Sequence, residues 1–288
     1  MRIAVTGARG QLGAAVVAAC AGRHDVVALT RAELDVADDR AVKATMNRLQ
    51  PDAIINCAAY NDVDGAESHP VEALDGNAFA VRALAAAAEA LGAVFVHYST
   101  DFVFDGTASS PYTEEDRPNP RSVYAASKLL GEWFAQDASR AYVLRVESLY
   151  GRAPGAAAPK GTVAGIMNRL LSGVDAKVLY DRVVSPTYVI DAARATLDLI
   201  ERAAPFGIYH CVNSGLCTWF ELAKELATQL GVEARLVPVA MSDMPLPAAR
   251  PRYCALSNHK LRSLGIVLPT WQDSLATFCR LERDASPR

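Results

Sequence analysis

Residues 6–13 read TGARGQLG, directly after an apolar run at residues 3–5. The glycines Gly7, Gly10 and Gly13 have the spacing GxxGxxG. In dinucleotide-binding folds the first such glycine allows a tight turn, the second lets the backbone approach a pyrophosphate, and the third lets a helix pack against the sheet. Free N–H groups at the start of that helix then face the phosphates. The stretch predicts a strand, a phosphate-binding turn and a helix, with a glycine-rich turn that binds nothing as the alternative.

The rest of the first half repeats this alternation of apolar runs and helical patterns. We expect further strands at residues 25–30, 52–58, 93–99 and 141–146, and helices at residues 11–21, 38–50, 71–91 and 122–137. Uninterrupted apolar strands that alternate with helices are typical of a parallel sheet covered on both faces, and right-handed crossovers make it doubly wound. The predicted fold class is therefore α/β, a Rossmann-type doubly wound parallel sheet with a smaller C-terminal substrate-binding lobe.

The regular pattern weakens near residue 151, where a stretch rich in Gly, Ala and Pro begins. We therefore predict an NAD(P)-binding Rossmann domain over residues 1–150, with a returning segment near 187–212. Residues 151–288 would form mainly the substrate-binding lobe. The helices expected in this second part lie at residues 163–172, 189–203, 218–230 and 271–283.

The composition excludes several classes of protein. The 288 residues carry a net charge of −3, too near neutral for a nucleic-acid-binding surface. The six cysteines are scattered without a CxxC pair or a Cys/His cluster, so we expect neither a zinc site nor disulfides. Arg9 and the glycines break up the apolar N-terminus, which excludes a signal peptide, and charges interrupt the alanine-rich stretch at 81–96, which excludes a membrane span. We predict a cytoplasmic protein without nucleic-acid or membrane partners.

The end of the second expected strand bears on the choice of cofactor. NAD-binding folds often carry an acidic residue about 20 positions after the glycine loop, but here Thr30 and Arg31 stand in that place. A hydroxyl and a guanidinium suit a ribose 2′-phosphate better than a carboxylate does. This favours NADPH, with NADH as the alternative, and a solvated Arg31 is an equal reading. Asp35 and Val36 would flank the adenine.

A possible reduction site follows the strand expected at 93–99. Thr100 and Asp101 lie at its tip, where open α/β sheets bind ligands. Tyr124 and Lys128 stand four apart in YAASK, so they share one helix face. Lys128 would lower the phenol pKa and, with Tyr124, contact the cofactor. Tyr124 would give its proton to a carbonyl oxygen that Thr100 orients. Taken alone, Tyr124 is better read as a partly buried structural tyrosine and Lys128 as a solvated charge, but together with Thr100 and the glycine loop they predict a catalytic set.

With these motifs in place, the sequence resembles the extended short-chain dehydrogenase/reductase superfamily. Within it the sequence is most similar to dTDP-4-dehydrorhamnose reductases, which make the last step of dTDP-L-rhamnose synthesis. The resemblance runs from residue 7 to about residue 257 and is carried by GARGQLG, INCAAYNDVDGAE, HYSTDFVFDG, YTEED, YAASKLLGE, RVESLYG, SPTYV and ARPRYCALS. It implies NAD(P)H-dependent reduction of the 4-keto group of a nucleotide-activated 6-deoxysugar.

The resemblance also implies roles for single residues. Those implied at the cofactor are Gly10, Gln11 and Leu12 at the pyrophosphate, and Ala58, Ala59 and Tyr60 along the cofactor. Those implied at the sugar nucleotide are Thr100, Asp101, Ser148, Thr187, and Arg250 or Arg252. Asn77 falls where the superfamily often places an Asn near the active-site helix, although it is nearly as well read as a polar residue inside a helix.

Some positions depart from the family pattern. Ser148, preceded by Glu147, stands where the family usually has a Trp against the sugar, so the identity of the sugar is in question. Ala15 stands where some members have a Glu that binds magnesium at a dimer interface, so we expect no metal there. Gly65 replaces a common Lys, and Thr30 replaces an acidic residue, which supports NADPH.

Two rival functions remain open. A nucleotide-sugar 4,6-dehydratase or epimerase would share the fold, but dehydratases carry an Asp-Glu pair where Asp101 is followed by Phe102. A regulatory subunit similar to that of methionine adenosyltransferase would bind a partner rather than catalyse. A homodimer is also left open, and the expected small-molecule partner is a nucleotide sugar.

Overall fold

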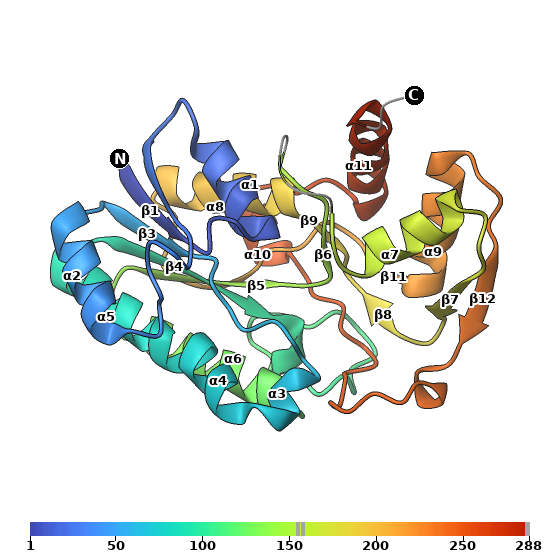
Figure 1. Cartoon of the computed structure of the whole chain (residues 1–288), viewed down its shortest axis with the longest axis horizontal. Coiled ribbons are helices and arrows are strands. Elements are labelled where there is room, and N and C mark those ends of the chain that lie inside the picture. The colour runs from blue at the N-terminus through green and yellow to red at the C-terminus, as the bar shows by residue number, and fades with distance from the viewer. Residues whose placement is uncertain (154–155, 157–158, 286–288) are drawn as a thin grey trace.

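The computed structural model describes residues 1–153, 156 and 159–285 (Figure 1). Its centre is a six-stranded sheet with the order β10-β5-β4-β3-β1-β2, and all of its strand pairs are parallel. The strands are β1 (Arg2–Thr6), β2 (Asp25–Leu29), β3 (Ala53–Asn56), β4 (Val94–Thr100), β5 (Ala141–Val146) and β10 (Gly207–His210). The prediction of a Rossmann-type doubly wound parallel sheet is confirmed.

Helices cover both faces of this sheet. One face carries α1 (Gln11–Cys20) and α8 (Val189–Glu201), and the other carries α2 (Asp39–Leu49), α5 (Ala80–Leu91) and α6 (Val123–Ala135) (Figure 1). The strands are apolar on both sides because successive side chains point to opposite faces. Ile3 and Val5 pack toward α1, whereas Ala4 packs with the core on the α2 side. This double burial explains the uninterrupted apolar runs in the sequence.

The second lobe has its own core, built by helices α7 (Thr162–Leu171), α9 (Trp219–Leu230) and α11 (Trp271–Ala285). It also holds three short strand pairs: β7 (Ala176–Leu179) with β12 (Leu236–Val239), β8 (Val183–Val184) with β11 (Cys217–Thr218), and β6 (Leu149–Tyr150) with β9 (Thr187–Tyr188). A short helix α10 (His259–Ser263) lies against β10. The domain boundary near residue 150 stays a prediction.

The single helix expected at residues 71–91 is interrupted. It consists of α4 (Pro70–Leu74), a π-helical turn at Asp75–Phe79 and then α5, and it is preceded by the short helix α3 (Gly65–Ser68). A π-turn widens the helix by one residue per turn and often marks a functional site. Here it carries Asn77, whose side chain is fully buried.

None of the helices in the described part of the chain is long and apolar enough to cross a membrane.

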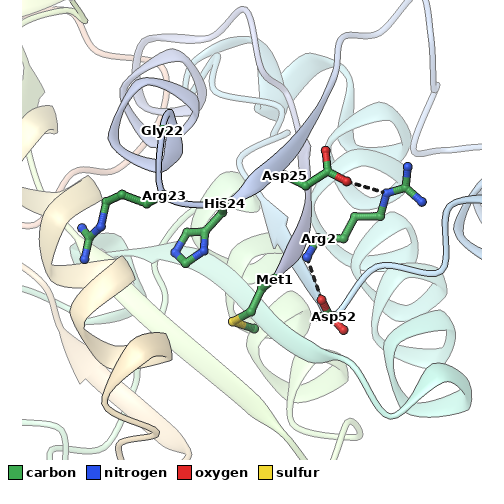
Figure 2. Close-up of a pocket in the computed structure, with 7 residues that line it drawn as sticks. All are labelled: Met1, Arg2, Gly22, Arg23, His24, Asp25 and Asp52. Carbon is green, nitrogen blue, oxygen red and sulfur yellow. Dashed lines mark hydrogen bonds and ion pairs between the residues drawn. The ribbon is translucent and has the colours of Figure 1, made fainter.

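A shallow groove of about 550 Å³ lies near the start of β1, beside the turn that leads into β2 (Figure 2). In it Arg2 forms an ion pair with Asp25 at 3.1 Å, and the Arg2 backbone N–H donates to Asp52 Oδ2 at 2.6 Å. The groove lies at the amino ends of the parallel strands. Ligands of open α/β sheets bind at the opposite, carboxyl edge, so we assign no site to it.

Candidate active site

A cleft of about 770 Å³ opens at the carboxyl edge of the sheet. It lies where β1 stands between β2 and β3, which is the point where the strand order reverses and where such folds bind ligands. We call it the glycine-loop cleft. Its lining comes from the loops after β1, β2 and β3 and from the start of the π-turn, and includes Gly7, Gly10, Thr30, Arg31, Asp35, Val36, Ala58, Ala59 and Tyr60.

The glycine loop admits no larger residue at two positions. Gly7 has φ +65°, and a Cβ there would lie 2.6 Å from the Ala58 backbone nitrogen. A Cβ on Gly13 would lie 2.3 Å from the Gly7 carbonyl oxygen. The turn is closed by the Gly10 N–H, which donates to that same oxygen at 2.8 Å. The loop therefore packs closely against the backbone that follows β3 and against the start of α1, so a side chain at Gly7 or Gly13 would displace the backbone.

Gln11 and Leu12 lie at the start of α1, but their side chains point elsewhere. The Gln11 amide donates to the Gly151 carbonyl oxygen at 2.5 Å, and the Leu12 side chain belongs to the core. Any contact of these residues with a pyrophosphate would therefore use their backbone N–H groups at the helix N-terminus, which Gly10 caps without a side chain. Their assignment to the cofactor stays a prediction.

The loop after β2 is exposed and charged. Arg31 has a side chain that is 89% exposed and pairs with Asp35 at 3.5 Å. The Thr30 N–H and hydroxyl both donate to the carboxylate of Glu33, a residue to which no motif had pointed. A second cation, Arg9, also lines the glycine-loop cleft. The cleft therefore offers two guanidinium groups near Thr30, with the carboxylates of Glu33 and Asp35 beside them.

The buried amide of Asn77 ties three elements together. Its oxygen accepts from the Tyr60 N–H at 2.9 Å, and its nitrogen donates to the Tyr60 carbonyl oxygen and to Ser127 Oγ, both at 3.0 Å. Ser127 in turn donates to the Tyr124 carbonyl oxygen at 2.8 Å. Asn77 thus fixes the cleft loop that contains Tyr60 against helix α6, which is more than the passive role of a polar residue inside a helix.

Thr100, Tyr124 and Lys128 are all buried where β4 and α6 meet. Lys128 Nζ donates to the Tyr98 carbonyl oxygen at 2.6 Å, and the Thr100 hydroxyl donates to Asp101 Oδ1 at 3.0 Å. The Thr100 side chain also acts on the Tyr124 phenol and lowers its pKa, against the larger raising effect of burial. One turn further along α6, Glu132 forms a buried two-point ion pair with Arg145 of β5, with both contacts at 2.8 Å. This pair fixes the rotation of α6 against the sheet.

Burial dominates the acid–base properties of this set. It raises the pKa of the Tyr124 phenol above its ordinary value of 10, and the Asp101 carboxylate raises it further. Burial also lowers the pKa of the Lys128 ammonium to about 8. Burial thus outweighs any lowering of the phenol pKa in the protein by itself, and the expected effect of Lys128 on that pKa stays a prediction. The phenol is held protonated, which is the form that a proton donor needs.

A group of buried charges lies beside Thr100, Tyr124 and Lys128. Asp101 and Glu147 follow the paired ends of β4 and β5, where Thr100 stands opposite Val146. Arg182, to which no motif had pointed, approaches Asp101 Oδ2 at 3.8 Å and stands over the Phe102 ring at 5.2 Å. Its only sequence signal is a cation three residues before the SPTYV stretch.

Three residues expected at the substrate are held by their backbone conformation, by burial or by other side chains. Ser148 is half-buried with φ +46°, a strained conformation for a non-glycine residue. Thr187 is fully buried and its hydroxyl donates to the Ser185 carbonyl oxygen at 3.2 Å. The guanidinium of Arg250 is occupied by Asp64. Their contact with a substrate stays a prediction. Arg252 also has an acidic partner, Asp181, at 3.3 Å.

Comparisons with known proteins place this geometry in a family. The family described as RmlD substrate binding domain matches residues 1–283. A dTDP-4-dehydrorhamnose reductase of Mycobacterium tuberculosis (strain CDC 1551 / Oshkosh) is 38% identical, over 96% of this chain and 91% of the relative. The solved structure of a dTDP-4-dehydrorhamnose reductase from Clostridium acetobutylicum has a TM-score of 0.93 at 35% identity, covering 98% of this chain and 100% of that one. A dTDP-4-dehydrorhamnose reductase from Bacillus anthracis, in complex with NADP, has a TM-score of 0.91 at 32% identity, covering 98% and 99%.

The parallel sheet, with its glycine loop at the point of strand reversal, defines a Rossmann-type protein. Within that class the chain belongs to the RmlD substrate binding domain family, together with dTDP-4-dehydrorhamnose reductases, and it is accordingly an oxidoreductase. The resemblance carried by the sequence motifs is confirmed.

Proposed function

We propose that the protein uses NADPH to reduce the 4-keto group of a nucleotide-activated 6-deoxysugar. The names of its relatives indicate dTDP-4-dehydrorhamnose as the substrate, which gives dTDP-L-rhamnose as the product. The observation that carries the proposal is the meeting of Thr100, Tyr124 and Lys128 at the carboxyl edge of the sheet that also holds the glycine-loop cleft. This combination supplies a dinucleotide site and a proton donor on one edge.

The residues of the glycine-loop cleft fit a dinucleotide. Its volume of about 770 Å³ lies within the range of small-molecule sites, and Gly7 and Gly10 allow the backbone to approach a pyrophosphate. Arg9 and Arg31 at one end suit a ribose 2′-phosphate, which favours NADPH over NADH. When bound, NADPH supplies the hydride that reaches the sugar carbon.

The chain itself supplies the proton and the electrostatics. Tyr124 gives its phenolic proton to the carbonyl oxygen as negative charge develops there. Thr100 orients that oxygen by a hydrogen bond, and the buried ammonium of Lys128 stabilises the phenolate that remains. Because all three side chains are nearly inaccessible to water, these interactions act in a medium of low polarity, where they are strongest.

The residue after Asp101 weighs against a dehydratase. Phe102 packs edge-on against the Tyr124 ring, with centroids 5.6 Å apart. An apolar ring at this place cannot exchange protons with a substrate, whereas elimination requires an added acid and base. The same contact holds the Tyr124 ring in place, which suits a single proton transfer.

The test is oxidation of NADPH and NADH by the purified protein with dTDP-4-dehydrorhamnose generated in situ. We expect oxidation that depends on the sugar, that is faster with NADPH and that yields dTDP-L-rhamnose. The matching UDP-sugar tests the nucleotide base. Cofactor binding without oxidation of either cofactor would contradict the proposal and point to a binding subunit or to another sugar.

A further inference from the structure

Two carboxylates are buried next to each other behind the catalytic set. Asp101 is 3% exposed and Glu147 is 1% exposed, and an oxygen of each lies within 4.8 Å of the other and of Cys254 Sγ. They come from neighbouring strand ends, so the sheet itself forces them together. Two like charges at this distance without water repel strongly. Such a pair persists in a folded protein only if the charge is neutralised.

The hydrogen bonds around the pair are incomplete. Glu147 Oε2 accepts from the Ser185 N–H at 2.7 Å and Asp101 Oδ1 accepts from Thr100 at 3.0 Å. The other two oxygens, Asp101 Oδ2 and Glu147 Oε1, are buried and have no partner at hydrogen-bond distance within the described part of the chain, although the nearby Cys254 thiol lowers the pKa of Asp101. Buried polar atoms are rarely left in that state. A proton between the two side chains would satisfy one as donor and the other as acceptor.

The charges of the neighbouring side chains indicate that one bound proton, rather than a metal cation, neutralises the carboxylate pair. Arg182 approaches Asp101 Oδ2 at 3.8 Å and supplies one positive charge against two carboxylates. Cys254 stays a thiol, because its Sγ donates to the Pro251 carbonyl oxygen at 3.2 Å and burial raises its pKa well above the ordinary value. One added proton makes Asp101, Glu147 and Arg182 neutral together, and neutral buried groups are the least costly.

We propose that Asp101 and Glu147 hold one proton between them, and that this proton resupplies Tyr124 through the Thr100 hydroxyl after each reduction. The relay rests on the proposed function. In it, the Thr100 hydroxyl, which donates to Asp101 Oδ1 at rest, turns and gives its proton to the phenolate oxygen of Tyr124. The Asp101 carboxyl then turns its acid O–H toward Thr100 Oγ1, and that O–H bond breaks as the proton passes to Thr100. The pair is then doubly ionised beside a single arginine, and it regains its proton from water between turnovers. Glu147 is thus a positioning residue that acts through Asp101 and Thr100.

Two properties of the site support this direction of transfer. The pKa of Glu147 is raised well above its ordinary value, by burial first and by Asp101 second, and burial also raises the pKa of Asp101. The pKa of Tyr124 is raised too, so a Tyr124 phenolate is the stronger base. The other titratable groups whose charges act on the pair are Arg182, Cys254, Cys217 and Tyr253, and Lys128 lies beyond on α6.

The first experiment observes the shared proton directly, without substrate or cofactor. Infrared spectra of the wild type, Glu147→Gln and the exposed-site control Glu233→Gln would be compared in H₂O and in D₂O at neutral pH. Gln can still accept from the Ser185 N–H, so the fold should persist, and circular dichroism checks this. We expect the carbonyl band of a protonated carboxylic acid in the wild type and in Glu233→Gln, shifted in D₂O and lost in Glu147→Gln. Loss of only a carboxylate band in Glu147→Gln would overturn the proposal.

The second experiment tests the relay by stopped flow with NADPH and dTDP-4-dehydrorhamnose. In Glu147→Gln the first turnover should stay within about twofold of wild type, because Tyr124 starts with its own proton, while later turnovers slow by about tenfold. The later rate should rise as the pH falls, because protons then come directly from water. A merely structural role would slow the first turnover as well, and that result, or unchanged later turnovers, would overturn the relay. If the wild type reduces no sugar, the relay falls with the proposed function, and the infrared result still decides the shared proton.

Discussion

The guanidinium of Arg250 donates a hydrogen bond to each carboxylate oxygen of Asp64, at 2.9 and 2.7 Å. The two residues are 186 positions apart in the chain. Asp64 immediately precedes α3, near the glycine-loop cleft, and Arg250 lies in the proline-rich stretch of the C-terminal part. The Ala248 N–H also donates to Asp64, at 3.1 Å. The contact therefore ties the C-terminal segment across to the cofactor side of the molecule.

The first prediction concerns this ion pair between Asp64 and Arg250. Asp64→Asn and Arg250→Lys each remove the two-point contact, so we expect both to raise the KM for the sugar nucleotide by about fivefold and to leave kcat nearly unchanged. Steady-state kinetics of the double variant complete a double-mutant cycle. The increase in KM of the double variant should be smaller than the two single increases combined. If Arg250 instead contacts the diphosphate directly, Arg250→Lys alone would raise the KM and Asp64→Asn would not.

Tyr124→Phe removes the phenol that we propose as proton donor and keeps the ring that packs against Phe102. We expect kcat to fall by at least about a hundredfold with an unchanged melting temperature. The exposed Tyr180 offers a matched Tyr→Phe control that should keep full turnover. Near-wild-type turnover in Tyr124→Phe would contradict the assigned proton donor.

The charge of Lys128 should limit activity at alkaline pH. Burial lowers the pKa of its ammonium to about 8, so the cation that stabilises the phenolate is lost as the pH rises through that value. We expect kcat/KM to fall above about pH 8, and Lys128→Met to lack both turnover and tight NADPH binding at any pH. A pH–rate profile and a cofactor fluorescence titration measure the two effects. A wild-type profile that stays flat to about pH 10 would contradict the role of Lys128.

Cofactor preference should depend on Arg31. Its side chain is almost fully exposed, so a contact with a 2′-phosphate would be partly screened by water. We expect Arg31→Ala to raise the KM for NADPH by about fivefold and to leave the KM for NADH unchanged. Arg40→Ala, on the exposed surface of α2, is the control. An equal effect on both cofactors would show that Arg31 does not distinguish them.

Glu147 should make the protein less stable as the pH rises. Its folded-state pKa is raised above the ordinary 4.5, so the folded chain holds a proton that the unfolded chain has lost. The free energy of unfolding then falls with rising pH, by up to about 1.4 kcal/mol per pH unit between that ordinary value and the folded-state pKa. Glu147→Gln removes this dependence. Between about pH 5 and about pH 8, the melting temperature of Glu147→Gln should rise relative to that of the wild type. A difference in melting temperature that does not change with pH would contradict the raised pKa of Glu147.

The local features of this protein were predictable because they depend on near neighbours. The GxxGxxG motif predicts the turn directly, because only glycine fits at positions 7 and 13. The spacing of Tyr124 and Lys128 fixes their shared face on any helix. Apolar runs with helices between them indicate a parallel sheet, and the strands and the helices of the first half lie close to the expected residues. The π-turn at Asp75–Phe79 was not visible, because its i→i+5 bonds leave no distinct sequence pattern.

What the sequence by itself determined was therefore the sheet, the glycine-rich turn and the grouping of Thr100, Tyr124 and Lys128. Only the tertiary structure decided which distant charges meet. Glu147 comes to Asp101 because β4 and β5 are neighbours, and Arg182 joins them from the second lobe. Such contacts depend on strand order and lobe docking, which no local pattern encodes. The same burial that brings these groups together sets their pKa values, so the electrostatics of the site arise from the fold rather than from the motif.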